Sequence, residues 1–300
     1  MLNGLLVIDK PVNWTSHDVV ARLRRLTGER RIGHAGTLDP FATGVLPTAV
    51  GRATRLLQYI QAQDKRYLAT IALGIETDSG DLTGQPLDPP FAGAWPTRAE
   101  VEATLSQFIG DIEQVPPVFS AIKVGGERLY HKARKGEDVS APPRQVHVHA
   151  LNLLAYDPPY LMLDVHCGKG TYIRAIARDI GRVLGCGGYC HALRRTSVGP
   201  FCLGDAWTLE ALADRDLAAM WPQTALHPDM GMLGVPAAIM NEDDALKWYH
   251  GRLIRPLLAG RHADDVVRVY GPEGEFAGLG ELAPEGALKP ALVFATEEKE

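Results

Sequence analysis

The most informative segment of this chain reads GHAGTLDPFATG and spans residues 33–44. It places one carboxylate, that of Asp39, among three glycines and a proline. Glycine permits positive φ angles and the close approach of another molecule, and Pro40 favours an extended backbone at Asp39. We therefore expect Asp39 on a rigid, irregular loop, the kind of element that often carries functional residues. The alternative is a structural turn in which the aspartate bonds its own backbone.

The composition indicates an ordinary soluble globular protein. Of 300 residues, 46% are hydrophobic and 22% are charged, which is typical of one large domain or of a large and a small one. No apolar run approaches the roughly 20 residues that span a bilayer. Residues 1–11 lack a basic region followed by a long apolar run, so they predict a first strand and no signal peptide. We therefore expect a cytoplasmic protein without membrane association.

Charge is distributed unevenly along the chain. The formal net charge is −5, but residues 20–66 hold nine basic and three acidic side chains. Residues 234–300 hold seven basic and twelve acidic ones. A basic front and an acidic tail are compatible with a polyanion on one face. A solvated helix face followed by an acidic terminus is the alternative.

Three short motifs are similar to metal-binding or nucleotide-binding motifs, but each lacks part of the residues that such a site requires. Cys186 and Cys190 precede His191, but a second pair of zinc ligands is missing, which favours reduced, buried thiols. Residues 78–84 have the acidic spacing of a calcium loop without its full ligand set, and they predict a turn. The glycines at 168–170 lack the spacing of a phosphate-binding loop. We therefore expect no metal and no cofactor.

Hydrophobic periodicity and capping residues predict a mixture of helices and strands. Strands are expected at 5–8, 67–73 and 161–167, and a hairpin at 266–270 and 276–280. Helices are expected from Thr15 or Ser16 to Gly28, over 53–60, over 97–108, and from a Thr171 cap to Gly185, the last with Ile173, Ile176, Ala177, Ile180, Val183 and Leu184 on its apolar face. The polar, basic segment 118–144 is interpreted as a projecting arm that grips a nucleic-acid backbone.

Five motifs occur in order along the chain: LVIDKP at 6–11, GHAGTLDP at 33–40, KRY at 65–67, GTYIR at 170–174 and LRR at 193–195. Together they resemble the TruB family, the bacterial tRNA pseudouridine-55 synthases. The resemblance runs continuously from Leu2 to Pro200. It implies an α+β pseudouridine-synthase fold, in which helices flank a mixed, mainly antiparallel central sheet. The tail is similar to a small, β-rich PUA-like RNA-binding module, so we expect a catalytic domain at 1–233 and this module at 234–300.

The resemblance also implies an activity and a set of residues. The family isomerises one uridine of the tRNA T-loop, position 55, without a cofactor. Asp39 matches the catalytic aspartate, expected to act as nucleophile on a flipped-out base; attack at C1′, attack at C6 and a glycal route all remain open. The expected substrate-binding residues are His34, Tyr67, Tyr172, Arg174 and Leu193. The expected partner is the T-stem-loop of tRNA, bound by a monomer without an obligatory protein partner.

Two other classes of function remain open at this stage. A tRNA-binding or RNA-folding protein could keep the scaffold without catalysis, although binding alone does not require Asp39, Tyr67 and Arg174 together. A hydrolase acting on a glycosidic bond would need a second, independently placed acid. Asp164 and Asp179 are the candidates for that acid, and neither has a recognisable motif around it.

Overall fold

One large mixed sheet organises the computed structural model, which describes residues 2–118, 123–124, 127–128, 141–256 and 265–294. Its strands are β1 (Gly4–Lys10), β2 (Ile32–His34), β3 (Thr43–Val50), β4 (Lys65–Leu73), β5 (Gly110–Gln114), β8 (Arg144–Asp157), β9 (Tyr160–Cys167), β10 (Gly188–Val198), β11 (Phe201–Cys202) and β12 (Ala206–Trp207). They run in the order β12-β1-β3-β10-β4-β9-β8-β5, with β2 beside β3 and β11 beside β10. The pairs β1–β12 and β3–β10 are parallel, and the other pairs are antiparallel. The predicted α+β class and the mixed, mainly antiparallel sheet are confirmed.

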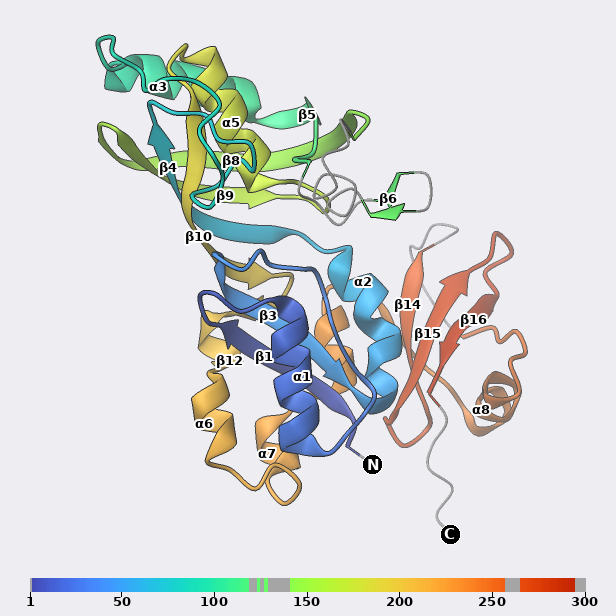
Figure 1. The fold of residues 1–300 in the computed structure, drawn as a ribbon. Helices are drawn as coiled ribbons and strands as arrows, with labels where there is room; N and C mark the ends of the chain where they lie inside the picture. The colour runs from blue at the N-terminus through green and yellow to red at the C-terminus, as the bar shows by residue number, and fades with distance from the viewer. Residues whose placement is uncertain (1, 119–122, 125–126, 129–140, 257–264, 295–300) are drawn as a thin grey trace.

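Most helices pack along this sheet, and the one at 242–249 packs beside the C-terminal strands instead (Figure 1). The helices are α1 (Ser16–Thr27), α2 (Leu57–Gln61), α3 (Arg98–Leu105), α5 (Ile173–Val183), α6 (Leu209–Ala213), α7 (Trp221–Thr224) and α8 (Glu242–Tyr249), with the 3-10 helices η1 (Gly51–Leu56), η2 (Ser106–Phe108), η3 (Leu203–Asp205) and η4 (Pro228–Met232). Helix α1 contacts β2, whereas α3 and α5 lie at the other end of the sheet, where α3 contacts β8 and α5 contacts β10 and β4 (Figure 1). In the described ranges, no helix is long and apolar enough to cross a membrane.

Helix α1 forms as its sequence predicts. Thr15 and Asp18 make a reciprocal capping box, and Gly28 ends the helix in the left-handed conformation with φ of 70°. These caps satisfy backbone groups that a helix end otherwise leaves unpaired. Val19 and Leu23 are fully buried, so the apolar face of the helix closes the core that carries the loop of Asp39.

Helix α5 begins differently from its prediction. Its N-cap is Tyr172, and the Thr171 hydroxyl donates instead to the carbonyl of Gly168 at 3.1 Å. The Gln114 amide accepts from the Tyr172 N–H at 2.8 Å and donates to the Tyr172 carbonyl at 3.1 Å. A long-range amide clamp therefore takes the place of the local cap. The predicted apolar face is confirmed at Ile173, Ile176, Ala177 and Ile180, but Val183 is 52% exposed because it belongs to the last, solvent-facing turn.

The remaining helices and strands of the main body largely follow the predictions. The strands expected at 5–8, 67–73 and 161–167 lie inside β1, β4 and β9. The helix expected over 53–60 is split into the 3-10 helix η1 and the short α2, and the helix expected over 97–108 continues from α3 into η2. Most of the predicted arm at 118–144 lies outside the described residues. Within it, β6 (Lys123–Val124) pairs with β7 (Glu127–Arg128), and the gripping role stays a prediction.

The C-terminal part forms a second sheet beside α2 (Figure 1). Its strands are β13 (Ala237–Ile239), β14 (Val266–Tyr270), β15 (Phe276–Leu282) and β16 (Leu288–Val293), in that order. The predicted hairpin is confirmed as β14 and β15. The module has its own core around the fully buried Trp248, but Phe276 and Leu292 also pack in one cluster with Leu5. The division at residue 233 stays a prediction.

We expect Gly44→Ala to destabilise the protein more than Gly28→Ala. Both glycines have positive φ, 101° at Gly44 and 70° at Gly28. A Cβ at Gly44 would collide with the Arg195 backbone across the β3–β10 pair, whereas a Cβ at Gly28 would meet no atom within 4 Å. The free energy of unfolding should fall by about 1 kcal/mol for Gly28→Ala and by about 2–5 kcal/mol for Gly44→Ala. Urea unfolding measures both values, and equal losses would contradict the proposed role of the close strand contact.

Candidate active site

The loop that carries Asp39 connects β2 to β3 and is held from below by buried side chains. Lys10, which is fully buried, donates from Nζ to the carbonyl oxygens of Pro11, Trp14 and Pro40 at 2.9, 2.6 and 3.2 Å. Burial lowers the pKa of Lys10 to about 8. The Ser16 hydroxyl accepts from the Leu38 N–H at 2.9 Å. These bonds hold the backbone on both sides of Asp39, and the predicted irregular loop is confirmed.

Arg195 ties the same loop to the centre of the sheet. Its side chain is 1% exposed, and it donates from Nε to the Val45 carbonyl at 2.7 Å and from Nη2 to the Gly36 carbonyl at 3.0 Å. Arg195 is paired with Gly44 on one side and with Tyr67 on the other. The loop, β3, β4 and β10 therefore form one rigid unit around this guanidinium.

The carboxylate of Asp39 forms an ion pair with Arg174 from the first turn of α5. Arg174 Nε lies 2.9 Å from Oδ2 of Asp39, and Nη2 donates to Oδ1 at 3.2 Å. The two side chains differ in exposure, since Arg174 is 3% exposed and Asp39 is 32% exposed. A planar guanidinium suits this arrangement because it stays charged and can grip both carboxylate oxygens. Asp39 and Arg174 are both site residues expected from the sequence, and the structure brings their side chains together.

A second carboxylate lies behind Arg174. Arg174 Nη1 donates to the Ser79 carbonyl at 2.7 Å and lies 3.4 Å from Oδ2 of Asp81. Oδ1 of Asp81 accepts from the Ser79 hydroxyl at 2.8 Å and from Thr83 N and Oγ1 at 2.9 and 2.6 Å. The turn predicted at 78–84 is confirmed. The ion pair of Asp81 with Arg174 was not predicted from the sequence. The hydroxyl residues around Asp81 are a signal for a buried carboxylate, but they do not identify its partner.

Burial controls the electrostatics of the pair. Desolvation raises the pKa of Asp39 above its usual value of 3.8, while the charge of Arg174 acts in the opposite direction. The negative charge of Asp81 adds to the increase. The site therefore holds a carboxylate that is desolvated and still paired with a cation, which makes it a stronger base than an ordinary surface aspartate.

Tyr67 and Leu193 line the sheet next to the loop. Tyr67 on β4 is paired with Arg195, and Leu193 on β10 is paired with Ala69, so both side chains lie on one face in neighbouring pairs. Tyr67 is 8% exposed and Leu193 is 7% exposed. Burial raises the pKa of Tyr67, and the nearby charge of Asp39 contributes to this increase. An aromatic ring and an apolar side chain thus lie near the carboxylate.

His34 and Tyr172 lie at the ends of the segments that carry Asp39 and Arg174. The ring of His34 packs edge-to-face on His17, with centroids 5.5 Å apart, and burial lowers the pKa of His34 to about 4. His34 is therefore neutral at physiological pH. The Tyr172 ring lies under the guanidinium of Arg144, whose central carbon is 4.5 Å from the ring centroid.

Three of the four cysteines are buried, and Cys202 is exposed. Cys167, Cys186 and Cys190 are buried, and the four cysteines are free. Burial raises the pKa values of the Cys186 and Cys190 thiols, which keeps both protonated at physiological pH. The burial of Cys186 and Cys190 agrees with the buried thiols that the sequence favoured.

Solved structures of other proteins share the fold of this chain. A chain of a solved Cbf5-Nop10-Gar1 complex shares this fold with a TM-score of 0.77 and 26% identity, over 97% of this chain and 85% of that one. A chain of an H/ACA RNP bound to a substrate RNA containing 2′-deoxyuridine also shares the fold, with a TM-score of 0.76 and 23% identity, over 98% of this chain and 86% of that one. The architecture is thus the pseudouridine-synthase fold with a small C-terminal β-sheet module, as predicted.

Family models cover nearly the whole chain. Residues 24–173 match the N-terminal domain of the TruB family pseudouridylate synthases, residues 174–228 the tRNA pseudouridylate synthase B C-terminal domain, and residues 236–294 the C-terminal model of pseudouridine synthase II TruB. The tRNA pseudouridine synthase B of Trichormus variabilis is 45% identical, over 98% of this chain and 99% of the relative, and that of an Arthrobacter species is 43% identical, over 100% and 99%. This chain therefore belongs to the TruB family of pseudouridylate synthases, which are isomerases.

We expect Arg174→Gln to destabilise the protein strongly, because it leaves the buried Asp81 and the partly exposed Asp39 without their cation. The free energy of unfolding should fall by about 3–5 kcal/mol at neutral pH. The loss should shrink as the pH falls, since protonation of Asp39 removes an unpaired charge. Arg182→Gln, on the same helix, is the matched control: Arg182 pairs with Glu76 but is 58% exposed, so its loss should be about 0–1 kcal/mol. Urea unfolding as a function of pH tests this, and similar losses for the two variants would contradict it.

Proposed function

We propose that this protein converts the uridine at position 55 in the T-loop of tRNA to pseudouridine, with Asp39 as the nucleophile and no cofactor. The observation that carries the proposal is the Asp39–Arg174 pair, in which a partly exposed carboxylate is fixed by a buried guanidinium. The full-length similarity to tRNA pseudouridine synthases B supports the choice of tRNA.

The chemistry requires little more than a well-placed carboxylate. The N1–C1′ bond breaks, the base rotates, and a C5–C1′ bond forms, so no atom or electron is gained or lost. Carboxylates are competent nucleophiles in glycosidic chemistry. Arg174 keeps Asp39 oriented and ionised within a site that would otherwise favour its neutral form.

Tyr67, Leu193 and Tyr172 are proposed to contact the uridine, and His34 is proposed to act where the base was stacked. Tyr67 stacks on the target base, an interaction worth about 1–3 kcal/mol per base. Leu193 and Tyr172 line the uridine site, Leu193 from β10 and Tyr172 beside Arg144. Neutral His34 fills the stack that the flipped base leaves. A base in a folded T-loop is inaccessible, so the flip is required at a cost of a few kcal/mol.

Contacts with the tRNA backbone offset this cost. We assign them to the basic residues in 20–66 and to the segment 118–144 of the catalytic domain 1–233. The module at 234–300 is proposed as a PUA-like RNA-binding domain that acts within the same monomer.

Two alternatives agree less well with the site. A protein that only binds or folds tRNA has no need of a carboxylate facing an anionic polymer. A hydrolase needs a second acid, and Asp81, the carboxylate closest to this role, is 5% exposed and receives hydrogen bonds at Oδ1. Asp164 is paired with Arg66, and Asp179 is paired with Arg178.

Asp39→Asn is expected to abolish isomerisation and to leave tRNA binding within a few-fold of the wild type, since the amide keeps the shape of the side chain and loses its nucleophilicity. The test incubates the protein with an unmodified tRNA transcript and maps pseudouridine by carbodiimide-dependent primer-extension stops. The wild type should produce one new stop in the T-loop. Activity in Asp39→Asn would overturn the mechanism, and tight binding without a stop in the wild type would favour the binding protein.

The pH dependence of single-turnover isomerisation should report the ionisation of Asp39. The rate should fall as the pH drops through the pKa of Asp39, which lies above 3.8. Asp81→Asn removes a negative charge that raises this pKa, so the acidic limb should move to lower pH. Asp179→Asn is the control and should leave the limb in place, because Asp179 pairs with Arg178. A shift to higher pH in Asp81→Asn would contradict the assignment.

A further inference from the structure

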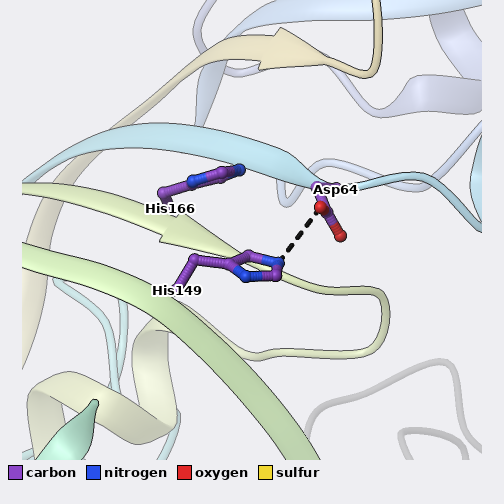
Figure 2. Close-up of side chains that lie close together, drawn as sticks. All are labelled: Asp64, His149 and His166. Carbon is purple, nitrogen blue, oxygen red and sulfur yellow. Dashed lines mark ion pairs between the residues drawn. The ribbon is translucent and has the colours of Figure 1, made fainter. Parts of the chain in front are cut away.

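Asp64, His149 and His166 form a cluster of potential metal ligands (Figure 2). His149 Nε2 lies 3.1 Å from Oδ2 of Asp64. The rings of His149 and His166 have centroids 4.5 Å apart. One potential ligand atom from each residue lies within 4.8 Å of the other two. Asp64 and His149 are exposed and His166 is half-buried, so an ion could reach the cluster from solvent.

Strand pairing fixes the backbone of this cluster. His166 on β9 is paired with Arg66 of β4 and with Ala150 of β8. His149 is the extra residue of a bulge between Val148 and Ala150. A bulge sets two residues opposite one and re-aims their side chains, which accounts for a second imidazole beside His166.

Asp64 completes the cluster from the residue before β4. Its carbonyl accepts from the Gly199 N–H at 2.9 Å, which ties this position to the end of β10. Figure 2 shows the Asp64 carboxylate and the two imidazoles pointing toward one another from three neighbouring segments. Bringing the three ligand atoms to metal-binding distances therefore requires rotation of the side chains and no movement of the sheet.

We propose that these three side chains bind one divalent transition-metal ion, represented by Zn²⁺, with water in the remaining coordination position. Two imidazoles and a carboxylate are a known protein ligand set for zinc, and imidazole suits this class of metal. With metal–ligand bonds of about 2.0–2.2 Å, neighbouring ligand atoms of a tetrahedral site lie about 3.3 Å apart. The 3.1 Å separation of His149 and Asp64 agrees with that value.

The surrounding charges leave room for the ion. Arg66, one of the nearby cations, has Nε 3.7 Å from Oδ1 of Asp164, and Lys65 donates from Nζ to the Gln61 carbonyl at 2.6 Å. His147, whose ring centroid is 4.6 Å from that of His149, has Nδ1 2.7 Å from Oδ1 of Asp111. A bound metal would link β8 and β9 to the start of β4, and it would stabilise the sheet by binding the folded state alone.

The experiment titrates the full-length protein, stripped of metal by a chelator and dialysed, with Zn²⁺ in a calorimeter and with Co²⁺ by visible absorption. We expect one equivalent to bind, an intense Co²⁺ band typical of four-coordination, and an increase in Tm with Zn²⁺. Asp64→Asn, His149→Ala and His166→Ala should each weaken binding by at least about 100-fold, since even outer partners of metal ligands contribute 10–100-fold.

His191→Ala is the matched control. His191 belongs to β10 of the same sheet, and its ring packs on Tyr160 with centroids 5.2 Å apart, so its loss should leave affinity, stoichiometry and the Co²⁺ band unchanged. An unfolding transition measured for each variant in the presence of chelator confirms that the variant is folded without metal. Absence of one-equivalent binding in the wild type would overturn the proposal, as would binding that survives the three substitutions or that requires His191. These readouts use no tRNA, so they are independent of the proposed isomerase activity.

Discussion

The structure depends on the guanidinium of Arg174, which lies between the carboxylates of Asp39 and Asp81. Removing a charged group from water is costly unless its partners restore the lost interactions. Arg174 meets this condition through two carboxylates and the Ser79 carbonyl. These contacts form only when three segments far apart in the sequence are in place together. Folding of the core and orientation of Asp39 therefore depend on the same contacts.

Two further buried cations support the loop without competing for its carboxylate. Lys10 donates to three backbone carbonyls, and Arg195 donates to two others. Their donors satisfy the polar backbone of an irregular loop, which secondary structure leaves unpaired. The result is a carboxylate held in place with Arg174 as its ion-pair partner, an arrangement that suits the nucleophilic role proposed for Asp39.

Local patterns predicted the helices and strands well where local forces dominate. Helix α1 carries a capping box, a left-handed C-cap glycine and an amphipathic face, and it forms as expected. The predicted start of α5 was wrong because Gln114, from a strand 58 residues away, forms hydrogen bonds with the backbone of Tyr172. The cluster of Asp64, His149 and His166 gave no signal, since a strand bulge creates it from residues that are scattered in the sequence.

Local sequence patterns are sufficient for the α+β class and for the elements with their own caps and periodicity. Five ordered motifs are sufficient for the family and for the roles expected of Asp39, Tyr67 and Arg174. Tertiary structure alone decided that Asp81 lies behind Arg174, that Lys10 and Arg195 hold the loop, and that desolvation raises the pKa of Asp39. The physical reason is that caps and periodicity act between near neighbours, whereas burial and charge pairing depend on distances that exist only once the sheet has closed.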